Sequence, residues 1–276
     1  LPEKMIKDFA SKVEKLIIIE ELDPFIEEYC YSIGLEVNGK DLLPLEDEFS
    51  QYQIAGIFGK EVPEGLALDE NIPVRPPVMC AGCPHRGLFY TLAKNKVTAL
   101  GDIGCYTLGA VPPLAALDTT ICMGASISGM HGFTKAGGAD GRKVVAVIGD
   151  STFMHSGITG LIDIVYNKGN NTVIILDNSI TGMTGHQQNP TTGKNIKGEP
   201  ANAVSLEALA KAVGIQNVIV VDPYNLAETK EGIKNALEAD GPAVVISRRP
   251  CALLKTVKHN PPLKVNADKC KSSKMC

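Results

Sequence analysis

Short, strongly apolar runs alternate with helix-like stretches over most of the chain, and this alternation constrains the fold more than any other feature. Six such runs are rich in β-branched residues, and they cover residues 97–100, 119–122, 144–148, 172–176, 218–221 and 243–247. Because successive positions in each run are apolar, both faces of each strand must be covered, as in a parallel sheet with helices on either side. The expected fold class is α/β, with a doubly wound parallel sheet.

The first part of the chain carries a different pattern. Helical periodicity extends from Met5 to Val13 and from Asp23 to Ile33, and the run KLIIIE at residues 15–20 predicts a buried strand between them. Residues 34–75 lose periodicity and carry prolines and many acids, which is typical of a connecting segment. We therefore expect a small α/β remnant with a linker over 1–71, the sheet domain over 72–255 and an extended basic tail over 256–276.

Composition and charge exclude several classes of partner. The net charge of −4 and the isoelectric point near 5.8 give no positive field that would attract nucleic acid or an anionic membrane. No apolar run approaches the roughly 20 residues of a membrane-spanning helix, and the first residues do not resemble a secretion signal, so we expect a cytoplasmic protein. Eight cysteines in a chain with a large core favour metal binding or redox chemistry over a disulfide framework.

Two polar motifs follow neighbouring apolar runs of the predicted sheet. Residues 149–152, Gly-Asp-Ser-Thr, follow the run VVAVI, and Asp177-Asn178 end the next run after one helix-length crossover. A glycine lets the backbone approach a diphosphate, and a helix N-terminus offers free N–H groups to it. Because the crossover returns Asn178 beside Asp150, their side-chain oxygens suit a magnesium ion that bridges two phosphates.

This spacing resembles the thiamine diphosphate signature, which implies Asp150, Asn178 and the carbonyl of Ile180 as magnesium ligands. In that pattern a bulky apolar residue upstream wedges between the two rings of the cofactor, and Met123 lies at the matching place; a gap-filling core methionine is the alternative. The glycine-rich run from Thr181 to Pro190 is expected to fold over the diphosphate. The expected cofactor contacts are Met123, Gly149, Asp150, Ser151, Thr152, Asn178, Ile180, Gly182, Met183 and Thr184.

Four cysteines lie where loops of the predicted sheet can converge. Cys80 and Cys83 form a C-x-x-C pair at the start of the sheet domain, and Cys105 and Cys251 each follow a predicted strand. Four thiolates at one point suit either zinc or an iron–sulfur cluster. Cys30 and Cys122 fall inside helix and strand patterns and are expected to be small buried apolar residues.

Taken together, the motifs CxGC, GxGC, GD…DN, GMTG and a final Pro-Cys resemble the 2-oxoacid:ferredoxin oxidoreductases. The forms CxGCPHR and DIGCYTLG favour the indolepyruvate branch. The resemblance implies that Cys80, Cys83, Cys105 and Cys251 hold a 4Fe-4S cluster. It also implies oxidative decarboxylation of aryl pyruvates, such as indolepyruvate, with coenzyme A as acyl acceptor and ferredoxin as electron acceptor.

The same resemblance implies further components. The family pairs two catalytic subunits with a smaller beta subunit, as a dimer of heterodimers. Cys270 and Cys276 resemble the start of an appended ferredoxin-like module, with Ser273 where a middle cysteine is expected. The chain lacks an initial Met and is expected to be part of a longer polypeptide. The glutamate that activates the cofactor's pyrimidine belongs to a separate domain, so we expect this chain alone to turn over little or no substrate.

Two histidines are candidate catalytic residues. His85 and His186 lie in loops of the family motifs and could face the substrate, while a capping or core role is the alternative for each. From Arg248 onward the tail holds eight basic residues and one acid, which suits docking of an acidic ferredoxin or simple solvation.

Two other functions share parts of this pattern. A non-redox thiamine-dependent decarboxylase or acetolactate-synthase-like enzyme has the GD…DN signature but no use for the four dispersed cysteines. A zinc-binding scaffold uses the cysteines but has no need for an intact Asp150 and Asn178 pair.

Overall fold

The computed structural model describes residues 1–62, 72–137, 144–261 and 264–271. The chain divides into two compact units, Leu1–Val74 and Arg75–Cys276. The boundary expected from the sequence lies near residue 72.

The first unit contains three helices in its described part, α1 (Glu3–Ala10), α2 (Phe25–Ser32) and α3 (Gln51–Ile57). The strand predicted over 15–20 is wrong. Ile17 makes only an isolated bridge with Asn38, flanked by two backbone hydrogen bonds, because no neighbouring strand among the described residues extends the ladder. Cys30 is fully buried in α2, as expected.

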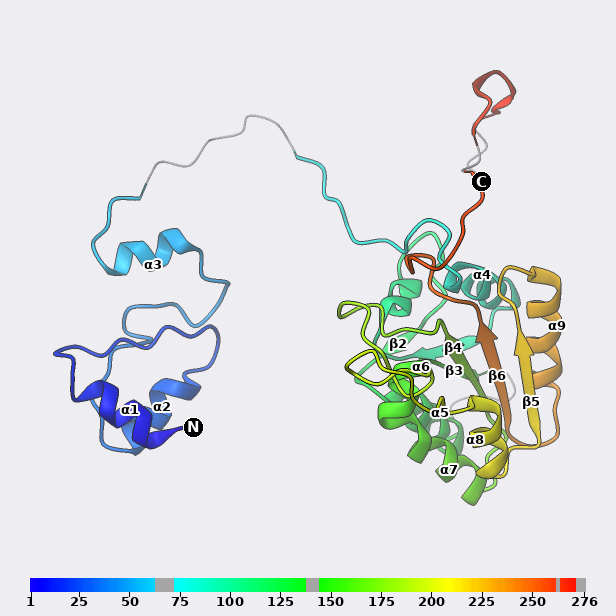
Figure 1. Ribbon diagram of the computed structural model, residues 1–276, viewed down its shortest axis with the longest axis horizontal. Coiled ribbons are helices and arrows are strands. Elements are labelled where there is room, and N and C mark those ends of the chain that lie inside the picture. The colour runs from blue at the N-terminus through cyan, green and yellow to red at the C-terminus, as the bar shows by residue number, and fades with distance from the viewer. Residues whose placement is uncertain (63–71, 138–143, 262–263, 272–276) are drawn as a thin grey trace. The chain divides into compact units, whose positions relative to one another are not determined.

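In the described part of the second unit, six strands form one sheet in the order β2-β1-β3-β4-β6-β5, and every neighbouring pair is parallel. The predicted α/β parallel sheet is therefore confirmed. The strands are β1 (Thr98–Gly101), β2 (Thr119–Thr120), β3 (Val144–Gly149), β4 (Thr172–Asp177), β5 (Asn217–Val221) and β6 (Ala243–Arg248). Figure 1 shows β6 beside β5 in this sheet.

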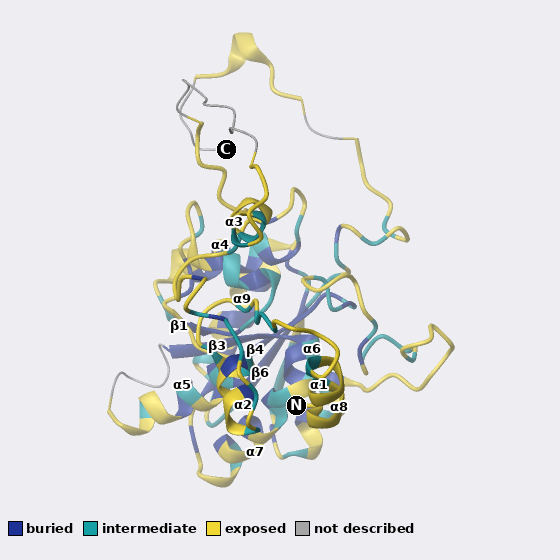
Figure 2. Ribbon diagram, turned by 90° about the vertical axis from the view of Figure 1, so that its left-hand side faces the viewer, coloured by how far each residue is buried: buried dark blue, intermediate teal, exposed yellow. Residues whose placement is uncertain are grey.

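Helices cover both faces of this sheet. The helices α4 (His85–Asn95) and α9 (Leu226–Leu237) pack on the face that includes Val145 and Val147. The opposite face, which includes Ile148, is covered by α5 (Ala125–Lys135), α7 (Ile158–Tyr166) and α8 (Leu206–Ala212). The central strands are dark blue in Figure 2, since β3 and β4 are buried along their whole length. Each fully buried Val or Ile side chain contributes roughly 1.5–3 kcal/mol.

Because all strands run in one direction, the loops that follow them meet at one edge of the sheet. These loops include η1 (Cys105–Ala110) after β1 and a helical run after β3, formed by α6 (Asp150–Thr152), the π-helical turn η3 (Phe153–Gly157) and α7. The strand order reverses between β1 and β3, and such a switch point is where open α/β sheets bind ligands.

The shortness of β2 corrects one expectation. The strand predicted over 119–122 ends at Thr120, so Cys122 lies beyond the sheet and is exposed rather than buried. The short helix η4 (Ala267–Lys269) lies near the end of the chain. Ser273 and Cys276 lie outside the described residues. Every helix in the described parts of the chain is too short or too polar to span a membrane.

Candidate functional site

A pocket of about 160 Å³ lies at the switch point of the sheet. Residues from the loops after β1, β3 and β4 line it, and we call it the glycine–aspartate pocket. All ten residues expected to contact a cofactor line this pocket, although the sequence spreads them from Met123 to Thr184. Its lining residues are His85, Ile103, Gly104, Cys105, Tyr106, Met123, Gly149, Asp150, Ser151, Thr152, Leu176, Asn178, Ile180, Thr181, Gly182, Met183 and Thr184.

Asp150 is a buried carboxylate in this pocket, with 2% of its surface exposed. Burial raises the pKa of its carboxyl to about 7; the backbone N–H of Ser151 opposes the rise and the Asp177 carboxylate adds to it. In the described part of the chain, no basic side chain forms an ion pair with Asp150. A buried carboxylate without a positive partner is unfavourable in its charged form. The residue therefore fits a role as ligand to a hard divalent cation.

Side chains that the sequence analysis missed hold Asp150 in place. Its Oδ2 accepts hydrogen bonds from Asn189 Nδ2 at 3.3 Å and from Thr191 Oγ1 at 3.4 Å. Asn189 is itself buried. Asn189 lies near the end of the loop expected to close the site, and Thr191 directly follows that loop. The start of the loop is held by Thr181 Oγ1, which donates to Ser151 Oγ at 2.8 Å. The sequence signal for Asn189 was its place in the glycine-rich run from Thr181 to Pro190, and for Thr191 it was only a polar side chain directly after that run.

Asn178 lies opposite Asp150 at the end of β4. Its Oδ1 accepts from the backbone N–H of Ile180 at 3.3 Å, and its Nδ2 donates to Nε2 of His85 at 3.5 Å. The backbone carbonyl of Asn178 accepts from the N–H of Cys251 at 2.9 Å. One residue thus connects the predicted magnesium ligands with one of the four predicted cluster ligands.

The aromatic ring of Tyr106 packs against Gly149 and leaves no room for a side chain at this position. A Cβ atom at this position would lie 2.8 Å from Cε1 of Tyr106. The hydroxyl of Tyr106 donates to the carbonyl of Ile103 at 3.0 Å, which fixes the ring against the turn. Any side chain at position 149 would therefore displace Tyr106 from the floor of the glycine–aspartate pocket.

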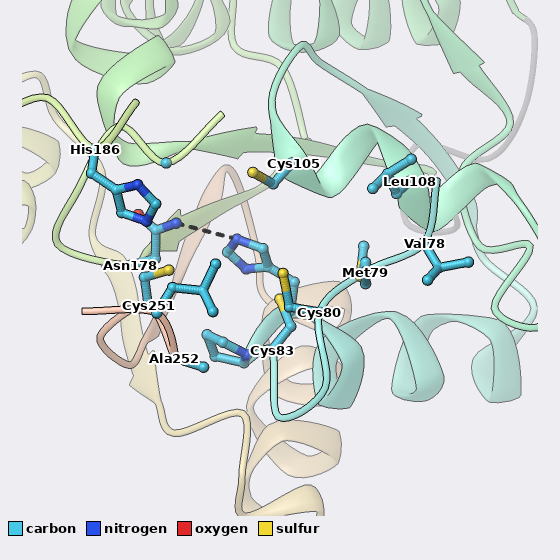
Figure 3. A pocket seen from close by; sticks show the side chains of 14 residues that line it. Val78, Met79, Cys80, Cys83, Cys105, Leu108, Asn178, His186, Cys251 and Ala252 are labelled. Atoms are coloured by element: carbon cyan, nitrogen blue, oxygen red, sulfur yellow. Dashed lines mark hydrogen bonds between the residues drawn. The ribbon is translucent and has the colours of Figure 1, made fainter. Parts of the chain in front are cut away.

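A second cavity of about 80 Å³ adjoins the first, and we call it the cysteine pocket. It is lined by Cys80, Cys83, Cys105 and Cys251 together with mainly apolar residues. Figure 3 shows the four sulfur atoms arranged around the same space. Cys80 and Cys83 precede α4, Cys105 begins η1 and Cys251 follows β6, so three separate loops bring the four thiols together.

The donor set of the cysteine pocket consists of four thiols, which suit an iron–sulfur cluster or zinc. Burial raises the pKa of the Cys83 thiol to about 11, and its three cysteine neighbours add to the rise. Burial also raises the pKa of Cys105. Within the described residues, no three His, Cys, Asp or Glu side chains are placed to hold one metal ion. Structural zinc needs four convergent ligands, whereas each thiolate of a 4Fe-4S site can bind its own iron.

The two pockets share a wall. His85, Cys105, Asn178 and Gly182 line both of them. A Cβ on Gly182 would lie 3.6 Å from the sulfur of Cys105, so the loop after β4 packs directly on this thiol. A single layer of side chains therefore separates the glycine–aspartate pocket from the cysteine pocket.

The two candidate histidines differ in position. His85 is buried between the pockets, its ring edge-on to Tyr106, and burial lowers its pKa to about 4, so it is neutral at pH 7. His186 is exposed and lines the cysteine pocket without reaching the glycine–aspartate pocket. The structure thus brings His85, but not His186, to the expected cofactor residues.

Two residues expected in a free basic tail are engaged elsewhere. Arg248 forms ion pairs with Asp177 and, through both terminal nitrogens, with Glu207. Arg249 forms a two-pronged ion pair with Asp222. These arginines are part of the sheet domain, and their guanidinium groups are paired with carboxylates of the same domain.

An open parallel sheet with a carboxylate pocket and an adjoining thiol pocket at its switch point is typical of an α/β enzyme that uses a bound cofactor. Comparisons with known proteins identify the class of enzyme. The family model described as "Thiamine pyrophosphate enzyme, C-terminal TPP binding domain" matches residues 102–247. The chain therefore belongs to the thiamine pyrophosphate enzyme family. This match spans the GD turn, Asn178 and the whole crossover between them.

Curated relatives place the chain more narrowly. It is 38% identical over 314 aligned positions to "Indolepyruvate oxidoreductase subunit IorA" of Pyrococcus horikoshii, covering 100% of this chain and 48% of the relative. The protein of the same name from Archaeoglobus fulgidus is 43% identical over 275 positions, covering 92% of this chain and 44% of the relative. The chain thus spans about half the length of these relatives. The predicted relationship to the 2-oxoacid:ferredoxin oxidoreductases is confirmed.

A solved structure shares the fold. A 2-oxoglutarate:ferredoxin oxidoreductase from Magnetococcus marinus aligns with a TM-score of 0.56 and 23% sequence identity. The alignment covers 64% of this chain and 65% of that chain. At this identity the likeness shows a common fold.

Proposed function

We propose that this chain forms the thiamine diphosphate and magnesium site of a 2-oxoacid oxidoreductase, with a 4Fe-4S cluster in the cysteine pocket. The observation that carries the proposal is the wall that the two pockets share. A decarboxylase without an electron acceptor has no use for four thiols beside its cofactor. The names of the curated relatives, which are indolepyruvate oxidoreductase subunits, support the same reading.

In the glycine–aspartate pocket, we assign Asp150, Asn178 and the carbonyl of Ile180 to magnesium. Ser151 and Thr152 offer the start of a helical run to the diphosphate. Residues 182–184 cover it from the loop after β4, and Met123 supports the rings. Bound thiamine diphosphate would supply the electron sink for decarboxylation, and the cluster would supply a one-electron acceptor. The chain's own residues would bind and orient the cofactor and keep water out of the pocket.

We assign His85 to contact with the substrate. It is neutral at pH 7, it lines both pockets, and its ring is fixed by Asn178 and Tyr106. A fixed neutral imidazole can orient a substrate by hydrogen bonding without adding charge. His186 lies at the cysteine pocket and is assigned a secondary role there.

The whole reaction that we propose is oxidative decarboxylation of an aryl pyruvate, such as indolepyruvate, to its acyl-coenzyme A. Ferredoxin accepts the electrons, and a smaller beta subunit completes a dimer of heterodimers. Residues 72–255 form the cofactor domain, and residues 256–276 begin a ferredoxin-like module. The pyrimidine-activating glutamate lies in another domain, so this chain alone binds the cofactor with little or no turnover.

The first test is anaerobic purification with magnesium and thiamine diphosphate, followed by iron analysis and visible spectroscopy. We expect the absorption of an iron–sulfur chromophore and about four irons per chain. Cys105→Ser should lose iron, whereas the exposed Cys122→Ser, which lines neither pocket, should keep it. A colourless, iron-free protein that still binds thiamine diphosphate would favour a non-redox thiamine enzyme instead.

A further inference from the structure

Asp102 follows β1 and is fully buried, with 0% of its surface exposed. Its carboxylate accepts hydrogen bonds from the backbone N–H groups of Gly124 at 3.0 Å, Ser126 at 3.1 Å and Ile103 at 2.9 Å. In the described part of the chain it has no basic partner. The carboxylate is therefore stabilised by backbone amides at the N-terminus of α5, where the helix dipole favours negative charge.

One of these amides controls a residue of the pocket. Gly124 directly follows Met123, which lines the glycine–aspartate pocket and is 43% exposed. Gly124 adopts φ +90°, and a Cβ there would lie 2.7 Å from the backbone oxygen of Ser156 in the π-helical turn. The turn that carries Met123 is thus held between Asp102 on one side and η3 on the other.

The backbone beside Asp102 also contacts the other walls of the pocket. The carbonyl of Ile103 accepts from Thr152 Oγ1 at 3.1 Å. The carbonyl of Asp102 accepts from Thr107 Oγ1 at 2.8 Å, and the same hydroxyl accepts from the N–H of Gly104 at 3.1 Å. The segment from Asp102 to Gly104 therefore joins the Met123 turn, the GD turn and the turn that begins with Cys105.

We propose that Asp102 is a positioning residue that fixes how far Met123 projects into the glycine–aspartate pocket. The inference rests on the proposed function, in which Met123 supports the cofactor's rings. Asp102 does not line the pocket, so it acts on Met123 through the backbone of Gly124 and not by direct contact. Because the methionine side chain is flexible, an anchored backbone limits the region of the pocket that the Met123 sulfur can reach.

The test uses the intact enzyme from which the cofactor has been removed. It compares the affinities of two ligands, thiamine diphosphate and inorganic pyrophosphate, each with magnesium. The Asp102→Asn substitution keeps the shape of the side chain but removes its negative charge. It also places the side-chain NH₂ group against backbone N–H groups, which need an acceptor. The loss of a charge-assisted hydrogen bond predicts about a tenfold weaker affinity for thiamine diphosphate. Pyrophosphate touches only the diphosphate end, so its affinity should change less than about twofold.

Two further variants sharpen the comparison. Met123→Ala should reproduce the selective loss, and the double variant should bind no more weakly than the single ones, because both act on one interaction. Asp118→Asn is the matched control. Asp118 also accepts a backbone hydrogen bond, from Ala99 at 2.7 Å beside β1, but it lines neither pocket. It should bind both ligands like the unaltered protein.

The outcomes separate this inference from the proposed function. Equal weakening of both ligands by Asp102→Asn, or no weakening of either, would overturn the positioning role. If that variant does not fold, amide hydrogen exchange of the cofactor-free, unaltered protein decides: slow exchange at Gly124 supports the anchor, and exchange as fast as in an exposed loop overturns it. Unaltered protein that does not bind thiamine diphosphate would instead refute the proposed function.

Discussion

The orientation of the Asp150 carboxylate depends on Asn189, a side chain that was not among the predicted cofactor contacts. Asn189 donates to Asp150 Oδ2 and accepts through its own Oδ1 from the N–H of Thr191 at 2.9 Å. It therefore holds the carboxylate in one orientation from 39 residues away. Partners of this kind typically contribute a factor of about 10–100 to metal affinity.

We therefore expect Asn189→Ala to weaken magnesium binding by about 10- to 100-fold in the presence of thiamine diphosphate, with little effect on folding. Isothermal titration with magnesium measures the change. Asn167→Ala is the control, since Asn167 also donates to an aspartate, Asp163, at 2.7 Å but is exposed and lines neither pocket. Equal losses in both variants would show that Asn189 has no special relation to the metal.

Residues carried by local motifs could be predicted, and residues set by long-range packing could not. Gly149 to Thr152 follow a strand directly, so sequence alone placed them at its end. Asn189 and Asp102 were missed because their partners lie 39 and 22 residues away in the chain. Arg248 was wrongly assigned to a free tail because its ion pairs with Asp177 and Glu207 form only once β6 lies beside β4.

At the scale of elements, the loop that carries Cys80 and Cys83 is held from two directions. Arg86 of α4 donates to the carbonyls of Met79 and Cys80. From the β5–α9 loop, the hydroxyl of Tyr224 donates to the carbonyl of Gly82 at 2.6 Å. The guanidinium of Arg249, after β6, lies 4.2 Å from the centre of the Tyr224 ring.

Tyr224→Phe keeps the ring beside Arg249 and removes only the hydroxyl. The lost hydrogen bond, about 0.5–1.5 kcal/mol, corresponds to a roughly two- to tenfold change in an equilibrium constant. We expect iron to be lost to a chelator more readily by this factor. Tyr90→Phe is the control, because Tyr90 also stacks with a cation, Lys94, yet no hydrogen bond to its hydroxyl is present among the described residues. Unchanged iron retention in Tyr224→Phe would exclude the restraint.

A second connection between elements gives a pH dependence. Glu207 of α8 pairs with Arg248 of β6, and this hydrogen bonding lowers the pKa of Glu207 from 4.5 to about 2. Because the folded-state pKa lies below the unfolded value, the stabilisation is complete above pH 4.5 and is lost as the pH falls toward 2. Partial exposure and solvent screening reduce it to about 1–2 kcal/mol.

Glu207→Gln should therefore lower the free energy of unfolding at pH 7 by about 1–2 kcal/mol and make it less dependent on pH between 4.5 and 2. Urea unfolding at several pH values measures both effects. The control is Glu231→Gln on α9, an exposed residue with no hydrogen bond or ion pair in the described structure. A Glu207→Gln curve parallel to that of the unaltered protein would rule out the linkage.

The strands were predicted correctly where neighbouring strands supply hydrogen-bond partners for their backbone groups. The run expected at 144–148 is observed at Val144–Gly149, buried between two parallel neighbours. The run at 15–20 holds four consecutive apolar residues, Leu16 to Ile19, yet it forms only one bridge, because no described strand lies beside it. Apolar character thus predicts a strand only when the rest of the fold supplies partners for its backbone groups.

For the whole molecule, the two compact units differ sharply in what they bury. Both large apolar clusters consist of residues from the second unit, between Met79 and Ile246. In the described part of the first unit, Cys30 and Leu43 are the buried apolar residues, whereas Met5, Phe9 and Phe25 are more than half exposed. Units below roughly 70–80 residues rarely gain enough from one core to be stable alone.

This difference predicts how the chain unfolds. A variant lacking residues 1–74 should keep the main cooperative transition seen by calorimetry, with its midpoint shifted by no more than about 4 °C. Residues 1–74 alone should show no cooperative transition, because they lack a core large enough to offset the loss of chain entropy. If the shorter variant instead lost its transition, stability of the sheet domain would depend on the first unit. The cofactor site would then need that unit as well, since both of its pockets are built from loops of the sheet.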